Sequence, residues 1–118
     1  IATLKMLRDS DVYKHLDQVS NRLYANLEKM FQEQGKPMVL ARNASAFCMY
    51  FCERAPQDLH DVLQTQDFAF DLRLRKALIE NGIYHIPIAC KQGSVSYAHS
   101  DEDIDKTLDI TWKVLKKM

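Results

Sequence analysis

The sequence predicts an α+β domain with a long N-terminal helix, a small antiparallel sheet of about four strands, and two further helices packed on that sheet. Three observations predict this fold class. A long apolar stripe at helical spacing opens the chain, two pairs of short β-branched and aromatic segments follow, and helical patterns lie between and after the pairs. Short strand pairs separated by helices are typical of α+β domains, so the expected order is helix, strand, strand, helix, strand, strand, helix. The 118 residues are enough for one such domain.

The first helix has the clearest pattern. We expect it to begin after Asp9 or Ser10, either of which can cap it, and to end at Gly35 and Pro37. Its apolar positions recur every three or four residues, as in an amphipathic helix, at Val12, Leu16, Val19, Leu23, Leu27 and Met30. A short helix over residues 1–7 is expected to precede it.

The first strand pair is expected at residues 38–40 and 46–52, joined by a turn at residues 42–45 that contains Asn and Ser. The second of these strands is apolar on both faces, with Phe47, Met49 and Phe51 on one and Cys48, Tyr50 and Cys52 on the other. Strands of this kind lie in the interior of a sheet. We therefore predict a central strand covered on both sides.

A polar connection follows at residues 53–64, with one turn of helix. Thr65 can cap the next helix, whose expected core face carries Phe68, Leu72, Ala77, Leu78 and Ile79. The basic residues Arg73, Arg75 and Lys76 are interpreted as a solvated face near the helix C-terminus, where positive charge is favourable. Gly82 ends this helix, because glycine adopts the left-handed backbone conformation that a helix end requires.

The second strand pair is expected around Ile83–Ile86 and Val95–Tyr97, joined by a loop from Pro87 to Gly93. Loops held between rigid strands often carry function, so this loop is the candidate site. Ser100 can accept a hydrogen bond from the amide of Asp103 and start the last helix. The apolar stripe of that helix is Ile104, Leu108, Thr111, Trp112 and Leu115.

Composition argues against several classes of function. Sixteen basic and sixteen acidic residues cancel, which disfavours binding to nucleic acid or to an anionic membrane. No apolar run reaches the ~20 residues that cross a bilayer, and no signal peptide is recognisable, so a soluble cytoplasmic protein is expected. RNA binding on the sheet would need exposed aromatic residues flanked by basic ones, which neither strand pair has.

Three cysteines suit a reducing compartment. Cys48 and Cys52 lie about 13 Å apart on an extended strand, too far to share a metal ion, and no metal site is expected.

No self-contained catalytic constellation is recognisable. There is no glycine-rich phosphate loop and no Ser or Cys in a nucleophile elbow. The acidic run at residues 101–105 is explained by the positive end of the last helix. His15 is interpreted as a boundary residue, His60 has no partner at a suitable spacing, and His99 is expected to orient the turn before the helix. Residue chemistry alone therefore indicates an α+β module without its own active site.

Several motifs nevertheless occur in the order of a known family. The stretch G-I-Y-x-x-P from Gly82, followed by S-x-A-H-S-D-E-D-I-D from Ser96, is the most specific. Before it come LKML-x-D-x-x-VY-x-HL from Leu4, R-N-A-S-A-F from Arg42 and T-x-D-F from Thr65. Together they resemble the C-terminal small domain of class III pyridoxal-phosphate aminotransferases, most closely the glutamate-1-semialdehyde aminomutase branch.

The resemblance implies a longer parent enzyme. In this family pyridoxal phosphate forms a Schiff base with a lysine of a large domain that lies upstream, and the small domain closes over an amino-acid or semialdehyde type of substrate. No lysine of this chain stands in the matching context, so the chain alone is expected neither to bind the cofactor nor to catalyse. The implied partners are the large domain and, in a homodimer, a second subunit. The chain begins with Ile1 rather than Met, and its first seven residues already follow a helical pattern without a capping residue before them, as expected for a chain cut from a longer one.

The loop departs from the family pattern. Where the aminomutases carry Ser-Gln-Phe-Glu-Ala after the proline, this chain has Ile88, Ala89, Cys90, Lys91 and Gln92. Ile88, Ala89, Cys90 and Lys91 are the substrate-facing candidates. Lys91 reverses the usual charge, so it either pairs with a substrate carboxylate or phosphate or is an idle exposed lysine. The substrate, and the choice between transfer and migration of the amino group, stay open.

An alternative of another class is a stand-alone module that binds a protein partner without catalysis. It predicts a start codon immediately before Ile1 and an exposed apolar patch that serves association.

Overall fold

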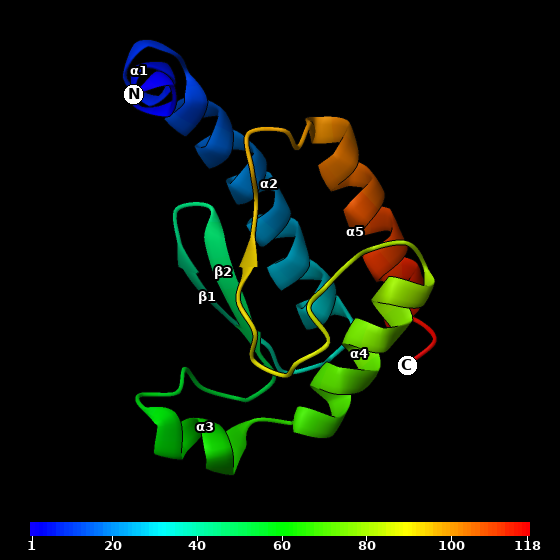
Figure 1. The fold of residues 1–118 in the computed structure, drawn as a ribbon. Helices are drawn as coiled ribbons and strands as arrows, with labels where there is room; N and C mark the ends of the chain where they lie inside the picture. The colour runs from blue at the N-terminus through cyan, green and yellow to red at the C-terminus, as the bar shows by residue number, and fades with distance from the viewer.

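A computed structural model describes residues 1–118 and confirms the α+β class (Figure 1). Five helices and three strands follow one another as α1 (Ala2–Asp9), α2 (Val12–Glu33), β1 (Val39–Asn43), β2 (Ala46–Tyr50), α3 (Leu59–Thr65), α4 (Phe68–Glu80), β3 (Gly93–Ser94) and α5 (Asp101–Leu115). None of the helices combines the length and the apolar content needed to span a bilayer.

The sheet is antiparallel, with β2 in the centre and β1 and β3 at its edges. A tight turn joins β1 to β2, and Ala44 takes a positive φ of 50° in it. Phe47 and Met49 of β2 belong to the buried core, to which α2, α4 and α5 also contribute. These three helices lie on one side of the sheet (Figure 1). Cys48 and Tyr50, on the opposite face, are only half-buried. The central position of β2 is therefore confirmed, whereas the expectation of cover on both faces is wrong for these residues.

The long helix forms as its pattern predicts, but it starts later. Ser10 ends α1, its hydroxyl donating to the Met6 carbonyl, and α2 begins after Asp11 without a side-chain cap. The predicted capping by Asp9 or Ser10 is thus wrong. Most of the predicted stripe is buried, and Ser20, Tyr24 and Phe31 widen it. Gly35, with φ of 61°, ends the helix as expected.

Two features of the middle of the chain differ from the prediction. The expected helical turn in the connection is α3, and Thr65 belongs to its end rather than capping α4. Asp67 caps α4 instead, its side chain accepting from the Phe70 amide at 2.8 Å. On α4 the buried face consists of Asp71, Leu74, Arg75 and Leu78, whereas Phe68 and Leu72 are exposed. Because Asp71 and Arg75 are charged, the apolar pattern of the sequence did not reveal that they lie on the buried face of α4.

Neither strand of the predicted second pair forms, because Ile83–Ile86 and Val95–Tyr97 are both irregular. A two-residue strand at Gly93–Ser94, where the predicted loop was expected to end, is the only one in this part of the chain, so the sheet has three strands rather than about four. Residues Ile83–Ile86 form no strand, and the Ile86 carbonyl accepts from the Arg75 side chain and from the Ile88 amide instead of from a neighbouring strand. Only Gly93 and Ser94 pair with β2, and the Val95 amide then donates to Ser45 at 2.9 Å. The chain between α4 and β3 is consequently a long loop.

The beginning of α5 agrees with the prediction. Ser100 accepts from the Asp103 amide at 3.1 Å and its own amide donates to the Asp103 carboxylate at 2.9 Å, which makes a reciprocal capping box. Gly82, with φ of 90°, ends α4 as expected.

Gly93 allows β3 to approach the core closely. A methyl group at its Cβ position would lie 2.6 Å from the Cζ of Phe47, a core ring that is itself packed against Tyr24. We expect Gly93→Ala to lower the free energy of unfolding by about 1–3 kcal/mol, because the ring or the strand must shift. Chemical denaturation of the variant, with the neighbouring exposed substitution Ser94→Ala as control, measures the effect. Equal stability of both variants would contradict the close approach.

Candidate functional site

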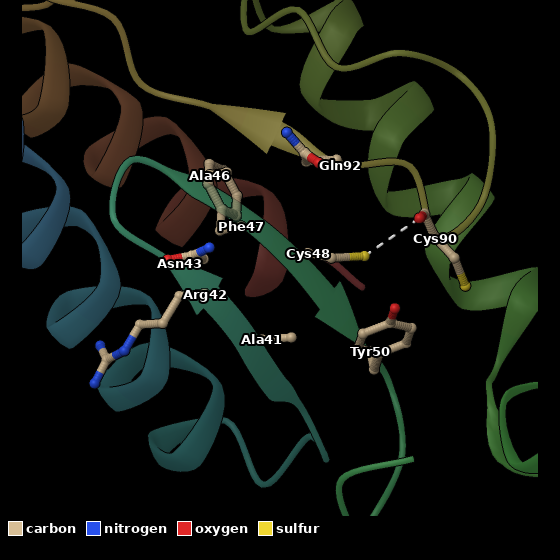
Figure 2. A pocket seen from close by; sticks show the side chains of 9 residues that line it. All are labelled: Ala41, Arg42, Asn43, Ala46, Phe47, Cys48, Tyr50, Cys90 and Gln92. Carbon is tan, nitrogen blue, oxygen red and sulfur yellow. Dashed lines mark hydrogen bonds between the residues drawn. The ribbon is translucent and has the colours of Figure 1, made fainter. Parts of the chain in front are cut away.

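The open face of the sheet is hollowed beside the loop that precedes β3. One shallow hollow of about 420 Å³ is lined by Ala41, Arg42, Asn43, Ala46, Phe47, Cys48, Tyr50, Cys90 and Gln92 (Figure 2). A second hollow, of about 620 Å³, extends from the same surface to α3 and shares Ala41, Tyr50 and Cys90 with the first. The two form one concave surface, and the loop residue Cys90 borders both parts.

A buried ion pair lies directly beneath this loop. Arg75 Nε donates to Asp71 Oδ1 at 2.6 Å, one helical turn apart on α4, and the two side chains are 2% and 1% exposed. Because both residues follow the Leu74 and Leu78 side of the helix into the core, their charges are removed from water. The interpretation of Arg75 as part of a solvated basic face is therefore wrong, although Arg73 and Lys76 are exposed.

The pair binds the loop backbone from both sides. Arg75 Nη1 donates to the Ile86 carbonyl at 3.0 Å and Nη2 to the Lys91 carbonyl at 3.1 Å. The Cys90 amide donates to Asp71 Oδ2 at 2.7 Å. A buried ion pair needs such additional hydrogen bonds to offset its desolvation, and here the loop supplies them.

Gln66 extends the network to the sheet. Its side-chain amide nitrogen donates to Asp71 Oδ2 at 3.3 Å, and its oxygen accepts from the Phe51 amide at 2.7 Å, just beyond the end of β2. The side chains of Arg75, Asp71 and Gln66 are thus linked by hydrogen bonds, and together they join the loop, α4 and the central strand.

The four candidate residues differ in their exposure. Ile88 is 59% exposed and Lys91 is exposed, whereas Ala89 and Cys90 are half-buried. Lys91 takes part in none of the ion pairs, so its ammonium group is free to meet a ligand. Cys90 has a φ of 56°, in the left-handed region that residues with a Cβ rarely adopt.

The cysteines near the hollow are poor nucleophiles. Burial raises the pKa of Cys90 to about 11, and burial likewise raises the pKa of Cys48. Cys48 Sγ donates to the Cys90 carbonyl at 3.3 Å, and the Cys90 sulfur points away from it (Figure 2). Both thiols therefore stay protonated near neutral pH. The structure contains no group of three or more His, Cys, Asp or Glu residues arranged to hold a metal ion.

The histidines singled out in the sequence have structural partners. His15 Nε2 donates to the His99 carbonyl at 2.8 Å, and His99 Nδ1 accepts from the Ser96 amide at 2.9 Å, which orients the turn before α5 as expected. His60 contacts Gln64 one turn further along α3. None of these rings reaches the concave surface.

His85 was missed by the sequence reasoning. It stands in the loop before Pro87 and borders a small hollow lined largely by the core side chains of α2, β2 and α4. Burial lowers the pKa of His85, and the charge of Arg75 lowers it further against an opposing effect of Asp71. The imidazole is therefore held in its neutral form. A lone histidine between Tyr84 and Ile86 gives no signal of this burial.

The lysines do not fit a pyridoxal-phosphate site within this chain. Such a site needs a lysine inside a cavity beside an anion-binding cradle. Lys36 is the one lysine that lines any of the five principal hollows, and its neighbours there are Pro37, Phe51, Asp67 and Phe70, without an anion-binding group. No chemical step through the cofactor is therefore assigned to these residues alone.

Comparison with known proteins shows close relatives over the whole chain. No protein-family model matches. The glutamate-1-semialdehyde 2,1-aminomutase of Thermodesulfovibrio yellowstonii is 30% identical over 118 residues, which are 100% of this chain and 27% of the relative. The enzyme of the same name from Desulfovibrio desulfuricans is 32% identical over 115 residues, 98% of this chain and 27% of the relative. The chain thus spans about a quarter of the length of these relatives.

Solved structures agree on the fold. A glutamate-1-semialdehyde aminomutase from Pseudomonas aeruginosa superposes with a TM-score of 0.81 at 18% identity, covering 92% of this chain and 24% of that one. The FumI protein of Sphingopyxis, solved as its internal aldimine with pyridoxal phosphate, superposes with a TM-score of 0.77 at 22% identity, covering 98% and 25%.

The lowered pKa of His85 predicts a pH-dependent stability. The unfolded chain takes up a proton near an ordinary histidine pKa of about 6.5, whereas the folded chain resists it. The contribution of neutral His85 is therefore fully present above that pH and is lost as the pH falls towards the folded pKa. We expect His85→Gln to flatten the fall in melting temperature between about pH 7.5 and 5.5. His60→Gln, on an exposed helix, serves as control, and an unchanged pH profile for His85→Gln would contradict the assignment.

Proposed function

Because this chain is homologous to the C-terminal quarter of glutamate-1-semialdehyde aminomutase and of the class III pyridoxal-phosphate aminotransferases, we propose that it acts as the small domain of such an enzyme. In this proposal the 118 residues form one domain that closes over the substrate of a longer chain. The domain supplies no cofactor lysine and does not catalyse alone. The large domain upstream binds pyridoxal phosphate, and the parent is a homodimer.

The alignment over the whole chain is the observation that carries this proposal, since relatives at 30% identity include every element from α1 to α5. Apolar surfaces that no other part of this chain covers also support the proposal. Helix α1 has no buried residue, and Leu4 on it and Ile1 immediately before it are 70% and 93% exposed. The open face of β2 adds a second uncovered surface. Contiguous exposed apolar surface is typical of a contact with another part of an assembly.

The concave surface bordered by the loop is where we place the substrate. Cys90 lies against both parts of this surface, while Ile88 and Lys91 are exposed beside it on the same loop. We assign Ile88, Ala89, Cys90 and Lys91 to the substrate-facing part of the domain. The free ammonium group of Lys91 suits a carboxylate, the group that amino-acid and semialdehyde substrates of this class carry.

The coding sequence upstream of Ile1 gives the first test. An open frame that continues for several hundred residues and contains a lysine after a strand would support the proposal. The full-length product should then absorb visible light when pyridoxal phosphate is bound to it, and lose this absorbance when the upstream lysine is changed. A start codon immediately before Ile1 would instead support the stand-alone interaction module and end the enzymatic interpretation.

Reversal of the loop charge tests the role of Lys91. In the full-length enzyme we expect Lys91→Glu to raise KM for carboxylate substrates by about tenfold, because one charge-assisted hydrogen bond is replaced by repulsion. The absorbance of bound pyridoxal phosphate should stay unchanged, since the cofactor site lies elsewhere. Lys14→Glu, an exposed and unpaired lysine on α2, is the matched control. If KM and substrate preference are the same in both variants, Lys91 does not face the substrate.

A further inference from the structure

We propose that Asp71 and Arg75 are positioning residues, which set the conformation of the loop from Ile86 to Lys91 and through it the presentation of the substrate-facing side chains. The functional part of this inference rests on the proposed function. Its structural part, that the pair determines the order of this loop, stands on the hydrogen bonds alone.

The geometry of the guanidinium group makes the assignment specific. Arg75 uses three of its nitrogens at once, one for the Asp71 carboxylate at 2.6 Å and two for the backbone carbonyls of Ile86 and Lys91 at 3.0 and 3.1 Å. These carbonyls stand at the two ends of the loop. A lysine ammonium is a compact group on a single stem and cannot span the three acceptors in this planar arrangement.

Asp71 holds the middle of the same segment. Its Oδ2 accepts from the Cys90 amide at 2.7 Å, on the residue that takes the positive φ of 56°. This conformation is unfavourable for a residue with a Cβ and persists where its surroundings hold it. The Cys90 amide and the Lys91 carbonyl are both bound, so the pair fixes the peptide that precedes Cys90 and the peptide that follows Lys91.

Few other contacts hold this loop. Tyr84 and Ile88 are 77% and 59% exposed, and Ile86 is also exposed, so apolar burial contributes little to its order. Within the loop the Ile88 amide donates to Ile86 at 2.8 Å and the Lys91 amide to Ile88 at 3.3 Å. From outside the loop, Cys48 Sγ of β2 donates to the Cys90 carbonyl at 3.3 Å, and Asp71 and Arg75 of α4 make three shorter hydrogen bonds to the loop backbone. Polar contacts with α4 are therefore the main ones that determine how the loop stands over the concave surface.

Stability alone does not account for the pair. Apolar residues of similar volume commonly replace a buried ion pair with little loss of stability, but they offer no donor or acceptor to a loop backbone. The three bonds from Asp71 and Arg75 to Ile86, Cys90 and Lys91 are what such a replacement would remove. Because the Lys91 carbonyl is one of the bound groups, the direction in which its ammonium group leaves the backbone depends on Arg75.

Hydrogen exchange of the full-length chain that contains these residues tests the inference. We expect Arg75→Lys to speed amide exchange in the peptide covering residues 86–92 by about tenfold or more, with little change in β2 and α5. Arg22→Lys is the matched control. Arg22 donates from Nε and Nη2 to both oxygens of Asp105 at 2.8 Å, so the same fork is lost at a site that joins α2 to α5.

A kinetic measurement tests the functional part separately. With L-glutamate and L-alanine as amino-donor probes, Arg75→Lys should raise KM by about tenfold and change kcat less, since a displaced binding loop weakens substrate contacts. Arg22→Lys should leave both constants unchanged. If the wild-type protein binds no pyridoxal phosphate, the proposed function fails while the exchange experiment still decides on the positioning role.

The isosteric variant Asp71→Asn keeps the inference testable if Arg75→Lys does not fold. It preserves the volume of the side chain and weakens the contacts to Arg75 and Cys90, so the same peptide should exchange faster. Wild-type exchange in residues 86–92 for a folded variant would overturn the proposal. The proposal would also be overturned if exchange accelerated uniformly along the whole chain, or if neither variant folded. Either result would mean that the ion pair stabilises the whole fold and does not act specifically on the loop.

Discussion

The ion pair between Asp71 and Arg75 is the constraint on which the loop and the concave surface depend. Two charges on one helical turn are brought into a region from which water is excluded, and this is costly unless their remaining hydrogen-bonding groups find partners. The partners are backbone groups of Ile86, Cys90 and Lys91, together with Gln66. The loop from Ile86 to Lys91 has few contacts with the apolar core, and its hydrogen bonds to the buried ion pair hold it in place.

The apolar pattern predicted the framework because burial of a stripe or of a strand face leaves a direct periodic signal. Val19, Leu23 and Leu27 repeat at helical spacing and lie in the core, and Phe47 and Met49 alternate along β2 as expected. Local capping chemistry was equally readable at Ser100 and Asp103, since both partners lie within one turn. Elements whose stability comes from nearby residues could be predicted.

The buried face of α4 and the missing strand could not be predicted for one shared physical reason. Arg75 reads as a surface residue, because an ion pair with Asp71 one turn earlier is also common on exposed helices, and the two carbonyls that it binds lie 11 and 16 positions further along the chain. One of these bonds occupies the Ile86 carbonyl, in the segment that was expected to be a strand, so the error in the helix and the error in the strand meet at the same contact. The candidate loop was chosen because two rigid strands were expected to hold it, but neither strand forms, and the side chains that hold the loop instead were not predicted.

The unpaired outer edge of β1 affects how the 118-residue chain behaves when it is studied in isolation. Val39–Asn43 pair with β2 on one side only, so their outward backbone groups can pair with a strand of another molecule. Arg42 places a positive charge on this edge. Its guanidinium group lies over the Tyr24 ring, and its Nη1 is 3.8 Å from Glu28 Oε2. That charge opposes intermolecular sheet growth, and the β1 edge is where self-association of the isolated chain would begin.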